Sequence, residues 1–174
     1  MNLPIHGLVT DSFVPTLENL SAILDKGSAY ADEKGIDLVN ARLAPDMFTL
    51  AEQVQSACNA ASDAVSRLTG AGPAEREEAK ATIPDLKDQI ARTIETVRSC
   101  PAAAFEGAER RECHIDLPDD MVIELDGTRF LTVLSLPNFY FHAVTAYDIL
   151  RQQGVEIGKM DYLRQIGQFI RKKA

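Results

Sequence analysis

Cysteine is scarce in this chain and follows no ligand pattern. The three cysteines, Cys58, Cys100 and Cys113, are far apart and include no Cys-x-x-Cys pair. An odd number of scattered cysteines fits neither a disulfide framework nor a zinc ribbon. We therefore expect reduced, buried thiols that act as small hydrophobic side chains.

Clustered positive charge is also lacking. The chain has 18 Lys and Arg against 26 Asp and Glu, a formal net charge of −8, whereas nucleic-acid phosphates require clustered Lys and Arg. Its one basic cluster lies near the end, at Arg164 and in the run "RKK" at 171–173. We expect a solvated tail there and no nucleic-acid partner.

Long hydrophobic runs are missing too. No stretch approaches the roughly 20 consecutive apolar residues that a membrane-spanning helix needs. The first residues, "MNLPIHGLVTDSF", have no basic residue before their apolar part and no small-residue cleavage pattern, so a secretory signal is not expected. With 45% hydrophobic and 25% charged residues, the composition predicts a globular cytoplasmic protein that does not bind membranes.

Three segments have the hydrophobic spacing of amphipathic helices. The first spans about 11–34, the second begins at a predicted cap, Asp46, and ends before a turn at 69–73, and the third begins at a cap at Thr82. In the second helix the apolar spacings alternate between three and four, which is typical of helices packed in a bundle.

The periodicity changes after the third helix. In "ECHIDLPDDMVIELDG", 112–127, apolar and polar residues alternate on both sides of a "PDD" turn, which predicts a β-hairpin. From Thr128 to Gly154 nearly every helix face is apolar, which indicates the central helix of a bundle. Pro137 lies in this run and predicts a kink or break near 134–136.

These elements predict an all-α fold, an up-and-down four-helix bundle with a small β-hairpin between the third and fourth helices. A short terminal helix is expected within 159–173. The length fits a single domain over 1–174, with its core at about 10–163 and a short basic tail at 164–174.

This arrangement resembles the DUF1993 family, whose members look like relatives of the DinB/YfiT superfamily of four-helix bundles. Four blocks carry the resemblance: "NLSAILDKG" at 19–27, "ARLAPDMFTLAEQVQ" at 41–55, "LPNFYFHAVTAYDILRQQGVEIGK" at 136–159 and "DYL" at 161–163. The resemblance implies a metal-binding type of fold. Three histidines would hold a divalent ion, one on the second helix and a His-x-x-x-His pair on the last.

The sequence departs from that ligand set. His142 matches the first position of the pair, but the second position is Ala146. The nearest candidates on the second helix are Gln53, Gln55 and Ser56. One imidazole gives too few nitrogen or sulfur donors for zinc or nickel, so we expect no bound metal and no cofactor.

His142 stands in a run of aromatic and aliphatic residues, and two interpretations stay open. It either belongs to a buried hydrogen-bonded network with Gln55 or Tyr147, or it lines a small-molecule pocket where the metal cleft would be. The predicted ligand-binding residues are His142, Gln55, Asn138, Tyr140 and Tyr147.

No catalytic residue is predicted. A Cys58–His142 pair is disfavoured because no cationic group near Cys58 would lower the pKa of its thiol. We expect a small-molecule-binding or stress-related protein. The alternative, implied by the resemblance to DinB-like enzymes, is a transferase or hydrolase acting on a small thiol-linked substrate. The apolar faces of the second and last helices also predict a homodimer.

Overall fold

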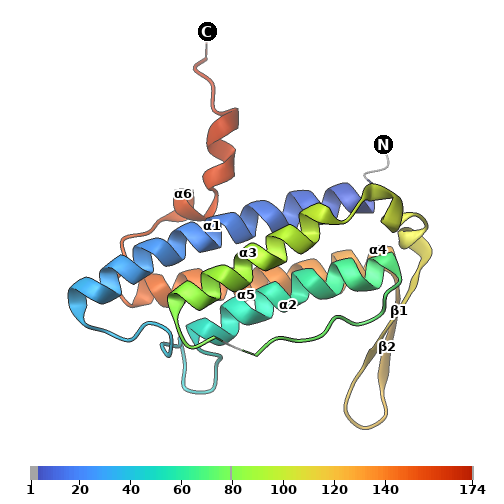
Figure 1. Cartoon of the computed structure of the whole chain (residues 1–174), viewed down its shortest axis with the longest axis horizontal. Helices are drawn as coiled ribbons and strands as arrows, with labels where there is room; N and C mark the ends of the chain where they lie inside the picture. The colour runs from blue at the N-terminus through green and yellow to red at the C-terminus, as the bar shows by residue number, and fades with distance from the viewer. Residues whose placement is uncertain (1–3, 79, 174) are drawn as a thin grey trace.

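The computed structural model describes residues 4–78 and 80–173, and this part of the chain is mostly helical (Figure 1). Four long helices form the bundle, and their bounds are α1 (Ile5–Lys34), α2 (Leu50–Thr69), α3 (Ile83–Ser99) and α5 (Leu136–Gln152). The predicted all-α four-helix bundle, with a hairpin before the last long helix, is confirmed.

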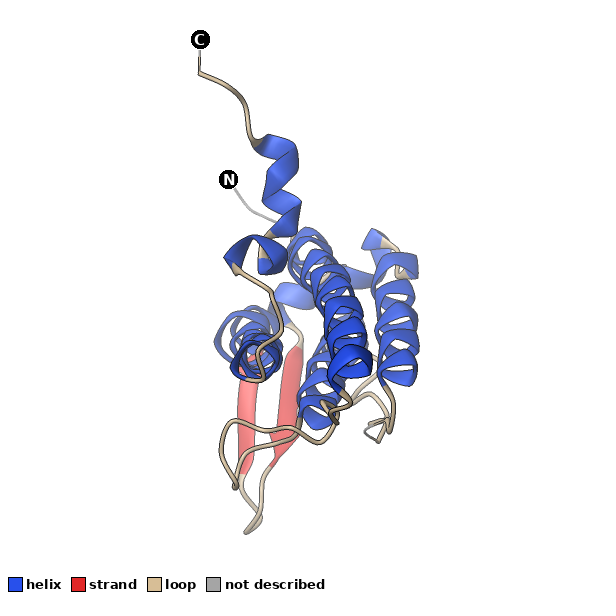
Figure 2. Cartoon of the chain, turned by 90° about the vertical axis from the view of Figure 1, so that its left-hand side faces the viewer, coloured by secondary structure: helices blue, strands red, loops and turns tan. Residues whose placement is uncertain are grey.

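The helix directions follow from one long connection. In Figure 1, α1 and α5 run in one direction, and α2 and α3 run in the other. The segment after α2 returns along the length of that helix before α3 begins, so α2 and α3 are parallel. This pair differs from the predicted up-and-down order, in which consecutive helices alternate in direction. The most extensive packing joins α2 to α5, and α1 packs mainly on α3. Figure 2 shows the helices side by side, end-on.

Two predicted helix starts are wrong. Helix α1 begins at Ile5, before the predicted start at about residue 11, because buried Ile5 and Val9 extend its apolar stripe. Helix α2 begins after Thr49 instead of Asp46. The Thr49 side chain accepts from the Glu52 backbone N–H at 3.3 Å, and the Glu52 carboxylate accepts from the Thr49 N–H at 2.7 Å. This reciprocal capping box outweighs a lone aspartate.

Other predicted boundaries are confirmed. The Thr82 hydroxyl accepts from the Asp85 backbone N–H at the start of α3. Gly70, in the left-handed conformation at φ 88°, ends α2. Strands β1 (Glu112–Asp116) and β2 (Val122–Asp126) pair antiparallel, with Ile115 opposite Ile123. The predicted hairpin therefore has the expected alternation.

The predicted break before α5 takes the form of a π-helical segment. A short helix α4 (Gly127–Arg129) leads into the π-helical segment η3 (Phe130–Ser135), which continues directly into α5. Pro137 lies in the first turn of α5, where its missing N–H costs little. The π-helical turns shift the rotation of the residues before Pro137 relative to those after it.

The end of the chain leaves the bundle. After α5, the helix α6 (Lys159–Tyr162) lies on α1, and the 3₁₀ helix η4 (Arg164–Phe169) projects away from the body (Figures 1 and 2). The Asn19 amide donates to the Tyr162 carbonyl at 2.9 Å and anchors this segment. Within the described residues, the helices are too short or too polar to cross a membrane.

The core is filled by the inward faces of all four long helices. Phe13 of α1 and Phe139 of α5 are fully buried and meet edge to face, with ring centroids 4.7 Å apart. At the base of the hairpin, Gly127 is buried against the turn that carries Ala108. A Cβ atom on Gly127 would lie 1.9 Å from the Ala108 carbonyl oxygen. Only glycine fits at this position without backbone movement.

We therefore expect Gly127→Ala to lower the free energy of unfolding by about 1–3 kcal/mol, the usual cost of overpacking. The matched control is Gly167→Ala, because a Cβ there meets no described atom within 4 Å. Urea unfolding of both variants checks the expectation. Equal midpoints for the two would contradict the close contact at Gly127.

Candidate functional site

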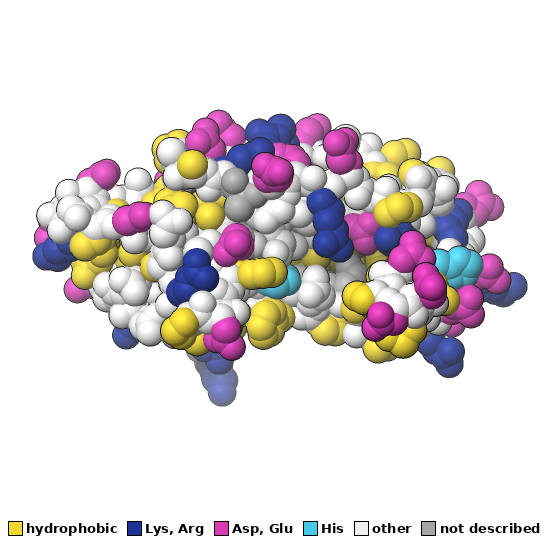
Figure 3. Space-filling view, turned by 90° about the horizontal axis from the view of Figure 1, so that it is seen from below, with side chains coloured by type: hydrophobic (Ala, Val, Ile, Leu, Met, Phe, Trp, Pro, Cys, Tyr) yellow, Lys and Arg dark blue, Asp and Glu magenta, His cyan; other side chains and the backbone are white. Residues whose placement is uncertain are grey.

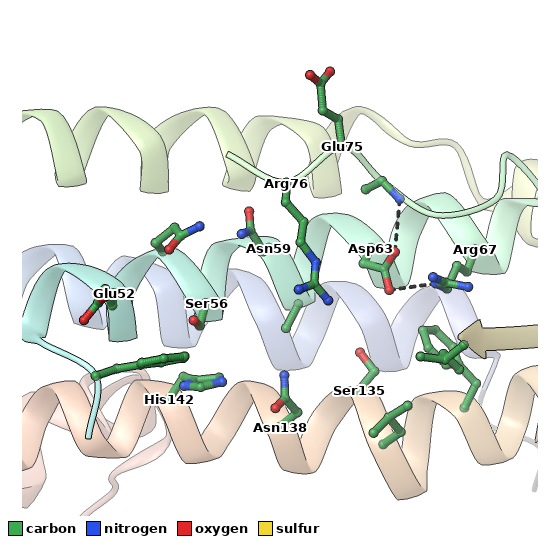
Figure 4. Close-up of a pocket in the computed structure, with 17 residues that line it drawn as sticks. Glu52, Ser56, Asn59, Asp63, Arg67, Glu75, Arg76, Ser135, Asn138 and His142 are labelled. Atoms are coloured by element: carbon green, nitrogen blue, oxygen red, sulfur yellow. Dashed lines mark hydrogen bonds and ion pairs between the residues drawn. The ribbon is translucent and has the colours of Figure 1, made fainter. Parts of the chain in front are cut away.

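A groove of about 440 Å³ runs between α2 and the η3–α5 helix (Figure 4). Its α2 wall is a stripe of polar side chains at helical spacing, and these are Glu52, Gln55, Ser56, Asn59, Asp63 and Arg67. The opposite wall has Ser135, Asn138 and His142. Apolar contacts come from Phe48, Ala60, Ile115, Phe130 and Leu134. Figure 3 shows the molecule from below, and acidic, basic and hydrophobic side chains are intermixed on that face.

His142 is the buried anchor of this groove. Its side chain is 8% exposed, and its Nδ1 atom lies 2.7 Å from the Oε1 atom of Gln53 on α2. Because an amide oxygen only accepts, Nδ1 carries the proton and donates, which leaves the Nε2 lone pair as an acceptor. Burial lowers the pKa of His142, so the imidazole is neutral at pH 7. Phe48 stacks on the ring, with centroids 6.1 Å apart.

The predicted partner of His142 is wrong. Gln53, not Gln55 or Tyr147, accepts its hydrogen bond. Residues two apart on a helix point to nearly opposite sides, so only one of the two glutamines can face the core. The Gln55 amide instead donates to the Glu77 carbonyl at the rim of the groove.

The sequence-predicted residues divide between the groove and other faces. His142, Gln55 and Asn138 line it, whereas Tyr140 and Tyr147 do not. Tyr140 is exposed on the outer side of α5, two residues from both groove positions. Tyr147 packs on Tyr162, with ring centroids 6.1 Å apart. The predicted ligand-binding set therefore loses Tyr140 and Tyr147, because the rotation of α5 places these two side chains outside the groove.

An ion pair closes the hairpin end of the groove. Arg67 Nε lies 2.8 Å from Asp63 Oδ2, and Arg67 Nη1 donates to the His114 carbonyl at 2.6 Å. The guanidinium also lies 5.9 Å from the centre of the Phe130 ring. Arg67 therefore ties α2 to the hairpin and to η3.

The connection after α2 forms the upper rim of the groove. We call residues 70–78 the strap. Its Ala74 N–H donates to Asp63 Oδ1 at 3.0 Å, and its Glu77 N–H donates to Asn59 Oδ1 at 3.4 Å. The Asn59 amide donates back to the Glu77 carbonyl at 3.3 Å. Side chains of α2 thus fix the backbone of the strap along the groove.

Sequence reasoning missed two residues at this site. Ser135, the last residue of the π-helical segment, is 5% exposed, and its Oγ has no hydrogen-bond partner among the described residues. Arg76 extends from the strap into the groove toward Asn138 (Figure 4). The only sequence signals were a proline two residues after Ser135 and a basic residue inside the acidic run "AEREE".

The residues present do not fit a three-histidine metal site. Ala146, one turn beyond His142, is fully buried and offers no ligand atom. On α2, the side chain that faces His142 is the Gln53 amide, bonded directly to it. Among the described residues there is no group of three or more His, Cys, Asp and Glu that could hold an ion.

Cys58 is not poised as a nucleophile. It is buried on α2, and burial raises the pKa of its thiol to about 12. A thiol with that pKa holds its proton at neutral pH and is a weak nucleophile. The geometry agrees with the expectation that Cys58 is a packing residue.

The depressed pKa of His142 has a testable consequence. In the unfolded chain His142 takes up a proton as the pH falls through about 6.5, whereas the folded state resists protonation. The wild type should therefore lose stability, relative to His142→Gln, from about pH 7.5 to about pH 5.5, because acid favours the unfolded state. Chemical unfolding across this range measures the difference.

The control for this series is His114→Gln, which replaces an exposed histidine on the hairpin. If the free energy of unfolding changes with pH in the same way for the wild type and His142→Gln, the folded state does not hold the imidazole neutral.

The comparisons with known proteins agree with this architecture. The sequence profile of a domain of unknown function, DUF1993, matches residues 5–163. The crystal structure of a DinB family member protein from Shewanella denitrificans is similar, with a TM-score of 0.81 and 38% sequence identity. The similarity covers 94% of this chain and 96% of that chain. No curated protein matches the sequence. The chain therefore belongs to the DUF1993 family and has the fold of the DinB-like four-helix bundles.

Proposed function

We propose that the protein binds a small organic molecule in the groove between α2 and α5. The observation that carries this proposal is the Ser135 hydroxyl, which is buried in the groove wall without a partner among the described residues. An unsatisfied buried polar group costs about 1–3 kcal/mol. A ligand with a polar group at this point would supply the missing hydrogen bond.

The groove has the size and chemistry of a ligand site. Its volume of about 440 Å³ lies within the range of roughly 300–1,000 Å³ typical of small-molecule pockets. Phe48, Ala60 and Leu134 offer apolar contact, and Asn138 and the His142 Nε2 atom offer polar contact. This mixture of apolar walls and few polar groups favours an organic ligand.

The proposal is for a binding site in which the metal ligands of the DinB-like fold have been lost. The Gln53–His142 hydrogen bond links the two walls directly. The described lining includes no cysteine, and Cys58 is held as a neutral thiol. The free cysteines Cys58, Cys100 and Cys113 also support the proposal of a reducing, cytoplasmic setting.

The test is a fragment screen followed by NMR with ¹⁵N-labelled protein. Hits should shift backbone resonances around Ser135, Asn138 and His142. Ala60→Phe fills the groove and should weaken the binding of these hits at least about tenfold, since it removes the space for apolar contact. Ala91→Phe is the control, because Ala91 is exposed on α3.

Two results would overturn the proposed function. One is a screen without hits at millimolar concentration, and the other is a set of hits that Ala60→Phe leaves unchanged. Protein made without a histidine tag should also contain well under one equivalent of zinc, nickel or manganese. Stoichiometric metal that survives dialysis against a weak chelator would contradict the loss of the metal site.

We also propose that two copies pair through the outer side of η3 and α5. Val133 and Phe141 are 65% and 57% exposed, and Pro137, Tyr140 and Val144 lie on the same helix face. The run 130–147 has no charged residue, although the chain carries a net charge of −8. Two such faces can therefore meet without repulsion between like charges, in the symmetric arrangement commonest among soluble oligomers.

Light scattering coupled to size exclusion tests this pairing. The wild type should have twice the chain mass of 19.1 kDa, and Phe141→Glu should have the mass of one chain because it places charge in the interface. Phe169→Glu changes a residue that is 72% exposed on the projecting segment, and it should remain dimeric. A wild type with the mass of one chain at all loadings would refute the dimer.

A further inference from the structure

We infer that the groove takes a small monocarboxylic acid, whose carboxylate pairs with Arg76 and whose apolar body lies between α2 and α5. This inference rests on the proposed function and names the class of ligand. It comes from an arginine without an ion pair at the rim and from donors on the opposite wall.

Among the charged side chains that line the groove, Glu75 and Arg76 make no ion pair within the described residues, and of these two Arg76 points into the groove (Figure 4). Asp63 and Arg67 neutralise each other at 2.8 Å. The Glu52 carboxylate accepts from the N–H and hydroxyl of Thr49 at the start of α2, and these bonds lower its pKa. On the strap, Glu77 pairs with Arg92 at 3.0 Å and Lys80 at 3.1 Å.

Arg76 has no hydrogen bond or ion pair with another side chain in the described part of the protein. In Figure 4 its guanidinium extends down into the groove, while its neighbour Glu75 points away. Dashed lines join Asp63 to Arg67 and to a strap N–H, and none reaches Arg76. The N–H groups of a guanidinium form a planar fork that matches a carboxylate. A bound carboxylate would therefore give Arg76 the ion pair that it lacks.

The strap holds Arg76 in position before any ligand binds. Ala74 and Glu77, which flank Arg76, are bonded through their backbone N–H groups to Asp63 and Asn59 of α2. Gln55 adds a hydrogen bond to the Glu77 carbonyl. A backbone fixed on both sides of Arg76 reduces the entropy lost on binding. This gives Gln55 a positioning role at the rim.

The opposite wall offers complementary groups. The Ser135 hydroxyl and the Asn138 amide lie one turn apart below the guanidinium (Figure 4). Both can donate to carboxylate oxygens. Ligands with more negative charge are disfavoured because the Glu52 and Asp63 carboxylates line the same groove. One unpaired guanidinium therefore matches a single carboxylate, and Phe48, Ala60 and Leu134 face the apolar part.

The experiment compares matched acids and amides, which differ in charge but hardly in shape. The probes are benzoate, 3-phenylpropanoate and 4-phenylbutanoate, each paired with its carboxamide, titrated into ¹⁵N-labelled protein. At least one acid should bind about tenfold tighter than its amide, as expected for a charge-assisted pair. Arg76→Gln should reduce that preference to within about twofold, and Ser135→Ala should weaken the acid severalfold.

Arg110→Gln is the matched control, because Arg110 is an exposed arginine outside the groove. The Arg110→Gln variant should keep the preference for the acid over its amide. Equal binding of acids and amides, or a preference that survives Arg76→Gln, would overturn the carboxylate inference. Amides or neutral fragments would then still bind in the groove, so the proposed function would stand. If no probe and no screened fragment shifts groove resonances, the proposed function fails and the inference fails with it.

Discussion

The hydrogen bond between His142 and Gln53 is the interaction on which the rest of the site depends. It joins the two helices with the most extensive contact, α2 and α5, through two buried side chains. It fixes the tautomer of the imidazole and leaves its Nε2 atom as an acceptor. Breaking it would leave buried polar groups unpaired, so it also holds the helix register. Where the DinB-like fold is expected to place histidine ligands, this chain has an amide and an imidazole bonded to each other.

The second constraint is the parallel arrangement of α2 and α3. Because both helices run in the same direction, their connection must return along α2. The amides of Gln55 and Asn59 and the carboxylate of Asp63 hold that connection on the helix. The groove therefore has a third wall, the strap, which carries Arg76. Topology, and not local sequence, brings this arginine opposite Ser135 and Asn138.

The sequence predicted much of the fold, and the reason is physical. Helical and alternating periodicities report which faces are buried, so they located the bundle and the hairpin, and the Thr82 cap marked the start of α3. Choosing between Gln53 and Gln55 needed the rotation of α2 to within a fraction of a turn, which periodicity does not define. Arg76 and Ser135 lie on a long connection and in a π-helical segment, where neither periodicity applies. The resemblance to DUF1993 singled out His142, but its partner came only from the packing of two helices.

The most direct test of this account is the protonation state of the His142 ring, measured by ¹⁵N NMR of the imidazole nitrogens at pH 7. We expect a neutral ring with a protonated Nδ1 and an unprotonated Nε2. A charged imidazolium, or a neutral ring protonated at Nε2, would contradict it, because the hydrogen bond to Gln53 would then not be the one that joins α2 to α5.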